Sequence, residues 1–198
     1  GAGNDTFKIT QATLTKADTI AGGDGTDILM NNADTATIAD AAFTNITSVE
    51  TVTSNGNNLF TSLTLDKLAY AAGVNTVTLT DINGGNDTVN IGKGFAGDIT
   101  VNLDDDANAN KVAANAAYAN SLTVKAKASL FDGDSANTIT GGAGSDTLNI
   151  IIDQTDTVGD FSAVTKVETI SLTDGAATTT SNGLVTLDNA NATYTSAS

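Results

Sequence analysis

The sequence predicts an all-β protein built from short strands, and three observations support this. The 198 residues include no Pro, Cys, His or Trp, and only 5% are aromatic, so small and β-branched side chains must form the core. Such side chains favour strands over helices. Short runs alternate apolar and polar residues between Gly, Asn and Asp, which is typical of strands with one buried face joined by turns. The third observation is an internal repeat.

The repeat relates two parts of the chain. "DTIAGGDGTDIL" (18–29) aligns with "NTITGGAGSDTL" (137–148) at an offset of 119 residues. "FTNITSVETV" (43–52) aligns with "FSAVTKVETI" (161–170) at an offset of 118, and the only two glutamates of the chain share one position of this second pair. A fixed offset of this kind indicates a repeated structural unit of about 120 residues.

The repeat sets the predicted organisation. Residues 1–17 are expected to end a preceding unit, 18–136 to form a complete unit, and 137–198 to begin a second one. The chain starts inside "GAGNDTF", which looks like the tail of a glycine-aspartate motif. We therefore expect it to be a segment of a longer protein.

The strands are predicted in order by the alternating runs. These runs are SVETVTS, SLTLD, NTVTLTDI, DTVNIG, DITVNL, SLTVKA, DTLNIII, KVETISL and LVTLD. Two segments have helical features: residues 65–73 place apolar residues on one face and end at Gly73, which would stop a helix. The Ala-rich segment 106–121 fits a helix and a set of turns equally well, because its Asn residues favour turns.

The net charge of −15 comes almost entirely from Asp. Asp favours turns and caps, so the charge is expected in the turns. With 8 basic residues against 23 acidic ones, nucleic acid is excluded as a partner, since binding it requires Lys and Arg to neutralise phosphates. The lack of Cys and His removes disulfides and the usual zinc ligands, which leaves hard, oxygen-binding cations. No apolar stretch approaches the roughly 20 residues of a membrane span, so no membrane insertion is expected.

Two glycine-aspartate motifs are the main candidates for a functional site. Residues 22–27 and 141–146 match the start of the pattern G-G-x-G-x-D-x-U-x, where U is a large apolar residue that falls on Ile28 or Leu29 in the first copy. Glycine tolerates positive φ and can turn carbonyl groups inward. Calcium binds six to eight oxygens from carboxylates and carbonyls together, so these turns are suited to hold it. The alternative is that they are plain β-turns.

The spacing of the motifs predicts partner residues. Stacked turns of this pattern need a ligand nine residues away, which is Asp18 for Asp27 and Asn137 for Asp146. Each of these residues carries an oxygen, and each is followed two positions later by an isoleucine. We therefore predict that both contribute to the calcium sites.

Several acidic residues are weaker candidates. Shorter forms of the motif place Gly85 two positions before Asp87 and Gly3 two positions before Asp5. Asp132 and Asp134 lie just before the second motif and are candidate ligands at its rim.

Other acidic residues are better explained without a metal. Asp104–Asp106 fit a solvated turn better than a metal site. Glu50 and Glu168 lie within strand patterns, and we expect them to point outward or to accept backbone hydrogen bonds at a strand edge.

The residue types argue against catalysis. No His is present to serve as the base for a nucleophile, and no Walker or dinucleotide motif occurs. The Asp clusters lie beside glycine turns, with no aromatic platform for a sugar. The chain is therefore not expected to be an enzyme.

With these motifs, the chain resembles calcium-binding RTX proteins, and more closely the RTX-type surface-layer (S-layer) proteins of Gram-negative bacteria. The glycine-aspartate nonapeptide carries the first resemblance, and the Thr/Ala/Asn-rich composition with "VETV" after the motif carries the second. The resemblance implies a right-handed parallel β-helix, or β-solenoid, with calcium-binding glycine-rich turns and up to two short helices. It implies several Ca²⁺ ions as cofactors, with ligands drawn from Asp24, Asp27, Asp146, Gly23, Gly25, Gly142 and Gly144.

The same resemblance implies a function. Surface-layer proteins are secreted by a type I system, fold on meeting extracellular calcium and self-assemble into a homo-oligomeric lattice on the cell surface. Attachment to lipopolysaccharide or another cell-surface glycan would use regions outside this segment. Two alternatives remain: an extender segment of a large RTX adhesin, and the calcium-binding module of a type I secreted hydrolase.

Overall fold

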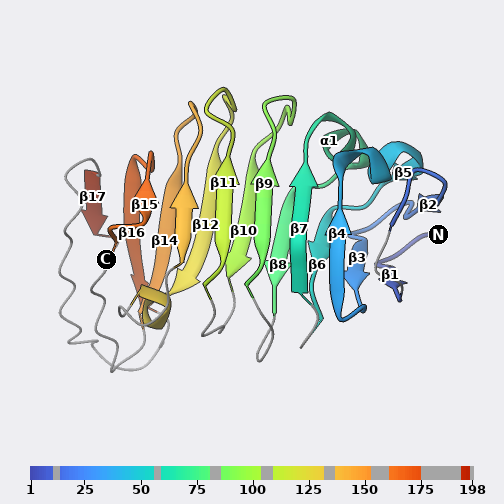
Figure 1. Ribbon diagram of the computed structural model, residues 1–198, viewed down its shortest axis with the longest axis horizontal. Helices are drawn as coiled ribbons and strands as arrows, with labels where there is room; N and C mark the ends of the chain where they lie inside the picture. The colour runs from blue at the N-terminus through green and yellow to red at the C-terminus, as the bar shows by residue number, and fades with distance from the viewer. Residues whose placement is uncertain are drawn as a thin grey trace.

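The computed structural model describes residues 1–10, 14–55, 59–80, 86–103, 109–131, 137–152, 161–174 and 193–196. Within these residues the chain forms a parallel β-solenoid (Figure 1). The strands of one sheet, such as β9 and β11, run upward in Figure 1, while β10 and β12 of the other sheet run downward. The prediction of an all-β, parallel solenoid is confirmed.

Two sheets form the walls of the solenoid, and a third small sheet lies near its N-terminal end. The long sheet contains, in order, β1 (Thr6–Ile9), β3 (Ile28–Asn31), β6 (Thr51–Thr53), β8 (Thr76–Leu79), β10 (Ile99–Leu103), β12 (Leu122–Lys127), β14 (Thr147–Ile152), β16 (Thr169–Asp174) and β17 (Thr193–Ser196). The short sheet contains β15 (Val164–Thr165), β13 (Thr138–Thr140), β11 (Lys111–Ala114), β9 (Thr88–Ile91), β7 (Leu59–Leu65) and β4 (Thr35–Ile38). The third sheet pairs β2 (Ile20–Ala21) with β5 (Ile46–Thr47).

The strand register explains the repeat offsets. Neighbouring strands of the long sheet pair residues that are 22 to 25 positions apart. Five such steps, through β6, β8, β10 and β12, lead from Ile28 to Thr147, which is the offset of 119. The next step, from Thr147 to Thr169, is one residue shorter than the step from Ile28 to Thr51, so the offset becomes 118. The repeat is therefore five turns of one solenoid.

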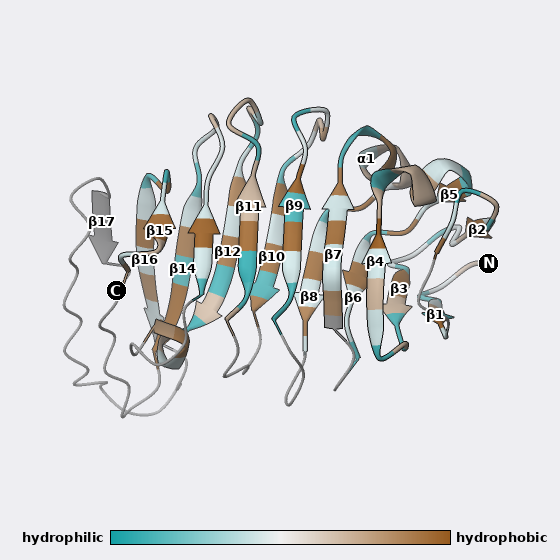
Figure 2. Ribbon diagram, viewed as in Figure 1, coloured by the Kyte–Doolittle hydropathy of each residue, from teal (hydrophilic) through white to brown (hydrophobic). Residues whose placement is uncertain are grey.

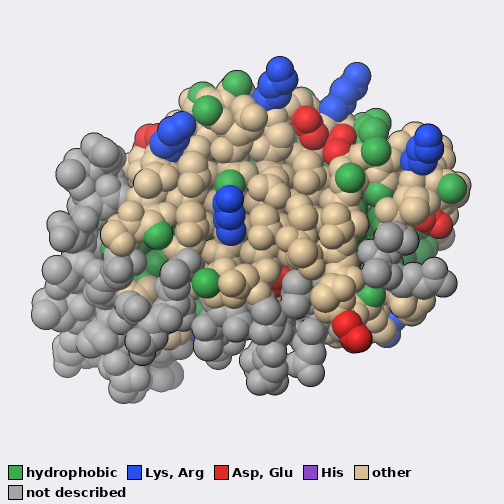
Figure 3. Space-filling view, in the orientation of Figure 1, with side chains coloured by type: hydrophobic (Ala, Val, Ile, Leu, Met, Phe, Trp, Pro, Cys, Tyr) green, Lys and Arg blue, Asp and Glu red, His purple; other side chains and the backbone are tan. Residues whose placement is uncertain are grey.

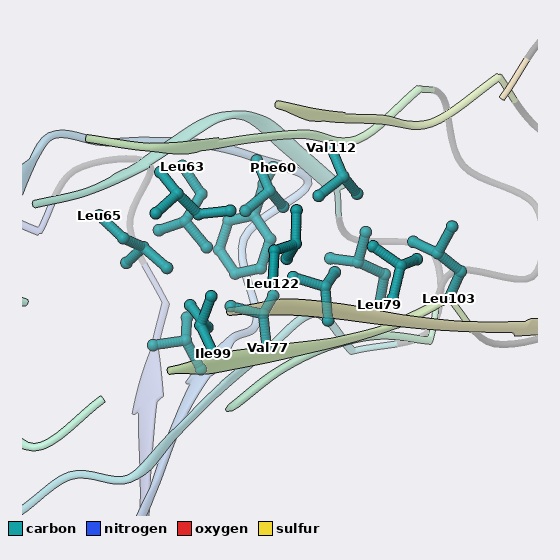
Figure 4. Close-up of a cluster of buried hydrophobic side chains, with 14 of the residues drawn as sticks. Phe60, Leu63, Leu65, Val77, Leu79, Ile99, Leu103, Val112 and Leu122 are labelled. Carbon is teal, nitrogen blue, oxygen red and sulfur yellow. The ribbon is translucent and has the colours of Figure 1, made fainter. Parts of the chain in front are cut away.

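The core fills the space between the two sheets. Along strands such as β10 and β12 every second residue points inward, which gives the banded hydropathy along the strands in Figure 2. Phe60, Leu63 and Leu65 of β7 face Val77 and Leu79 of β8 in the interior, and all five are completely buried (Figure 4). In the first motif the large apolar position is Leu29, which is completely buried, whereas Ile28 is partly exposed.

The helices are short, and the segment left open between a helix and a set of turns contains a strand. The helix α1 (Lys67–Ala72) lies within the predicted segment 65–73, and Gly73 ends it with φ of 106°. In the second segment, the described residues 109–121 contain β11, because Val112 packs into the core between its neighbours in the short sheet. Two 3₁₀ turns complete the elements, η1 (Asp40–Asn45) and η2 (Ala128–Phe131). None of the helices in the described part of the chain has the length and apolar character needed to cross a membrane.

Candidate functional site

The first glycine-aspartate motif forms a corner of the solenoid. Residues 22–27 link β2 to β3 and stack directly on residues 1–5 of the preceding turn. A Cβ atom on Gly23 would lie 2.0 Å from the carbonyl oxygen of Gly1, and a Cβ atom on Gly25 would lie 2.4 Å from the carbonyl oxygen of Gly3. Both glycines also have positive φ, 109° and 129°. Only glycine allows the backbones of two turns to approach this closely.

The predicted nine-residue stacking was wrong, because one turn of this solenoid takes 22 to 25 residues. The residue beneath Asp27 is Asp5, whose backbone N–H donates to Asp27 Oδ1 at 2.7 Å. Asp18 instead accepts the backbone N–H of Thr15 at 2.8 Å in an exposed loop. It lines a separate cleft of about 330 Å³ beside β1.

Carboxylates in the residues that immediately precede strands of the long sheet accept hydrogen bonds from backbone N–H groups of neighbouring turns. Glu50 Oε2 accepts the N–H of Asp27 at 2.8 Å, and Glu168 Oε2 accepts the N–H of Asp146 at 2.7 Å. Asp146 Oδ1 accepts the N–H of Leu122 at 2.8 Å. The expectation that the two glutamates accept backbone hydrogen bonds is confirmed.

A cradle beside the first corner holds an unsatisfied oxygen. Asp27 is completely buried, and its Oδ2 atom has no hydrogen-bond partner. A Cβ atom on Gly22 would lie 2.2 Å from this Oδ2 and 1.8 Å from the carbonyl oxygen of Ser48, so the two oxygens are within about 4 Å of each other, the sum of these distances. A buried carboxylate oxygen that has no donor and lies near a carbonyl oxygen is unfavourable unless a cation or a proton lies between the two oxygens. Asp27 Oδ2 and the Ser48 carbonyl therefore fit a hard cation.

Ser48 and Lys166 were missed by the sequence reasoning. Both have φ of 53° and they occupy equivalent positions of the repeat. Neither residue type favours the left-handed region, so this conformation carries strain of about 1–2 kcal/mol, and no sequence signal marks it. Its result is that each carbonyl oxygen points at the first glycine of a corner, Gly22 or Gly141.

The second corner, residues 141–146, satisfies its own carboxylate. Asp146 Oδ2 accepts the backbone N–H of Gly142 at 2.6 Å. This corner stacks on the turn at Tyr118, since a Cβ atom on Gly142 would lie 2.5 Å from the Tyr118 carbonyl oxygen. The Tyr118 hydroxyl donates to the Gly97 carbonyl at 2.7 Å, and burial, with the nearby carboxylates, raises its pKa.

The pKa of Asp146 lies above its ordinary value, because burial disfavours the charged form and the charge of Glu168 adds to this, although backbone hydrogen bonds from Leu122 and Gly142 oppose the rise. A carboxyl group with a raised folded-state pKa stabilises the fold at low pH, and this contribution is lost as the pH rises through that pKa.

We therefore expect wild type to gain stability relative to Asp146→Asn as the pH falls from 7 towards the ordinary Asp pKa of about 3.9. Urea unfolding of both proteins in chelator at several pH values measures the difference. A difference that is constant, or that shrinks on acidification, would contradict the expectation.

A second column of polar side chains lies before the short-sheet strands. The N–H of Phe60 donates to Asp87 Oδ1, the N–H of Asp87 donates to Asn110 Oδ1 at 2.8 Å, and the N–H of Asn110 donates to Asn137 Oδ1 at 2.9 Å. We call these three side chains the polar ladder. Asn137 also donates to the Leu130 carbonyl at 2.9 Å. It is therefore part of the polar ladder, and the residue beneath Asp146 is Leu122. Asn110 was missed because its segment looked partly helical.

The remaining candidates are spread out. Asp24 is exposed in the first corner, and its N–H donates to the Gly1 carbonyl at 3.1 Å. Gly85, Asp132, Asp134 and Asp104–Asp106 lie outside the described residues. Within the described ranges, no three His, Cys, Asp or Glu side chains are grouped closely enough to hold a metal ion by themselves. A cation at the first corner would need backbone carbonyls and water as well as carboxylates.

The comparisons add no relative from which a role could be carried over. No protein-family model matches this chain, and no curated protein and no solved structure shows significant similarity to it.

Proposed function

We propose that this chain is a calcium-stabilised structural segment of a secreted, self-assembling surface layer of a Gram-negative bacterium. The observation that carries the proposal is the first corner, where the buried, unpartnered Oδ2 of Asp27 faces the carbonyl oxygen of Ser48. A carboxylate and a backbone carbonyl are the oxygen ligands that calcium uses. The role is structural, not catalytic.

The weak ligand set suits an extracellular setting. One or two carboxylates with carbonyls and water resemble calcium sites with dissociation constants of about 0.1–1 mM, which are filled outside cells. Such a site would keep the segment unstable before secretion and stabilise it afterwards.

Charge supports calcium-dependent assembly. Each chain carries a net charge of −15, so copies repel one another unless cations reduce that charge. The face shown in Figure 3 is mostly uncharged, with scattered Lys and a few acidic side chains among the described residues. Calcium would lower the repulsion and allow such faces to pack in a lattice.

Calcium is expected to raise the melting temperature. At a calcium concentration one hundred times the dissociation constant, one site stabilises the fold by about 2.7 kcal/mol, which corresponds to a rise of about 5–10 °C for a chain of this size. Circular dichroism melts in chelator, in calcium and in magnesium measure this, and magnesium should act more weakly because it demands a stricter octahedral geometry. An equal melting temperature in chelator and calcium would refute the calcium role.

Electron microscopy of the full-length protein tests assembly separately. A two-dimensional lattice that forms in calcium and dissolves in chelator is the expected result. Isolated rods in calcium would instead support the adhesin extender, and a catalytic domain in the full-length sequence would support the secreted hydrolase.

A further inference from the structure

We infer that the two corners have diverged. The first binds a divalent cation, whereas in the second a backbone N–H satisfies the carboxylate and the surrounding side chains are less negative. This inference rests on the proposed calcium function and assigns it to one of the two motifs. Both motifs match the same pattern at every glycine and aspartate, so the sequence alone treats them as equivalent.

The carboxylate oxygens differ between the corners. Both aspartates are buried, with 0% of Asp27 and 1% of Asp146 exposed. Asp27 Oδ2 has no hydrogen-bond partner, whereas Asp146 Oδ2 accepts the N–H of Gly142 at 2.6 Å. The second carboxylate therefore has a donor where the first has only an acceptor, the carbonyl of Ser48.

The backbone accounts for this difference. Gly23 has φ of 109°, while the equivalent Gly142 lies outside the left-handed region. In the second corner the backbone turns the Gly142 N–H into the carboxylate. In the first corner no N–H fills that place, and the buried oxygen is left for a cation.

The charges around the corners differ in the same direction. The first corner contains Asp24, and it stacks on Asp5. The equivalent residues of the second corner are Ala143 and Leu122, which carry no charge.

The residue that supplies the carbonyl changes as well. Lys166 stands where the first corner has Ser48, and its exposed side chain adds a positive charge to the surface of the second corner. Among the side chains, these exchanges remove two negative charges and add one positive charge, which weakens the attraction for a cation.

The test compares calcium binding by matched variants of the whole chain. Isothermal titration calorimetry with Ca²⁺ should show that Asp27→Asn lowers the affinity of the strongest site about tenfold or more, while Asp146→Asn changes it less than about twofold. Asn keeps the Oδ1 acceptor for the N–H of Asp5, so the corner should still fold. Equal losses in both variants, or a larger loss in Asp146→Asn, would overturn the inference.

A second variant tests the inference without removing a carboxylate. Ser48→Lys places the charge of the second corner at the first, and Lys166 shows that lysine adopts this backbone conformation. We expect about a tenfold loss of affinity for Ser48→Lys and no loss for Lys166→Ser. Unchanged affinity in Ser48→Lys would overturn the inference even if Asp27→Asn fails to fold. If wild type binds no calcium at about 10 mM, well above the range of weak extracellular sites, the proposed function itself fails.

Discussion

Gly22→Ala is expected to destabilise the solenoid by about 4 kcal/mol. The new Cβ atom would lie 1.8 Å from the Ser48 carbonyl oxygen and 2.2 Å from Asp27 Oδ2. The first of these is a backbone atom held by the next turn, so the clash can be relieved only by separating two turns. The melting temperature should fall by about 10 °C in chelator as well as in calcium.

The control is Gly73→Ala, which introduces backbone strain at a positive φ but no steric clash. Gly73 has φ of 106°, but its Cβ would meet no atom closer than 3.4 Å. The strain at this helix end should cost about 1 kcal/mol. Chemical denaturation of both variants measures the difference, and equal losses would show that the corner relaxes around the added methyl group.

Asn110→Ala is expected to cost about 3 kcal/mol, because it breaks the polar ladder in its middle. Asn110 is 1% exposed, and its Oδ1 accepts the N–H of Asp87, a residue that is itself completely buried. Truncation leaves that N–H without its acceptor, which costs about 1–3 kcal/mol, and the missing side-chain volume adds to the loss.

Asn102→Ala provides the matched control for this loss. Asn102 points outward from β10 and donates to the Thr78 hydroxyl at 3.2 Å in a partly exposed position. Its truncation should change the stability by less than about 0.5 kcal/mol. If Asn110→Ala lost as little stability as Asn102→Ala, water would be replacing the lost acceptor, and the polar ladder would contribute little to the stability of the fold.

The strands could be predicted because alternation is local. Val77 and Leu79 alternate with threonines, and this pattern alone places them in the core. The stacking partners could not be predicted from the motif, since the number of residues per turn depends on the linking segments. The partner of Asp27 is Asp5 and not Asp18 because a full turn, with both its walls, separates the stacked residues.

Other features of the site leave no local mark in the sequence. The left-handed conformation of Ser48 is imposed by the stacked turns and not by the residue. The different environments of Asp27 and Asp146 arise from the backbone at Gly142 and from residues one turn away, so the glycines and aspartates that the motifs share carry no sign of them.

The variable turn length has a consequence for growth of the molecule. A turn of 22 residues and one of 25 both add a single strand to the long sheet, because the extra residues are absorbed at the corners and linking segments. Each turn therefore lengthens the rod by one strand spacing, about 4.8 Å, however many residues it uses. Duplication of the five-turn repeat would extend the rod by about 24 Å, so its reach is counted in turns and not in residues.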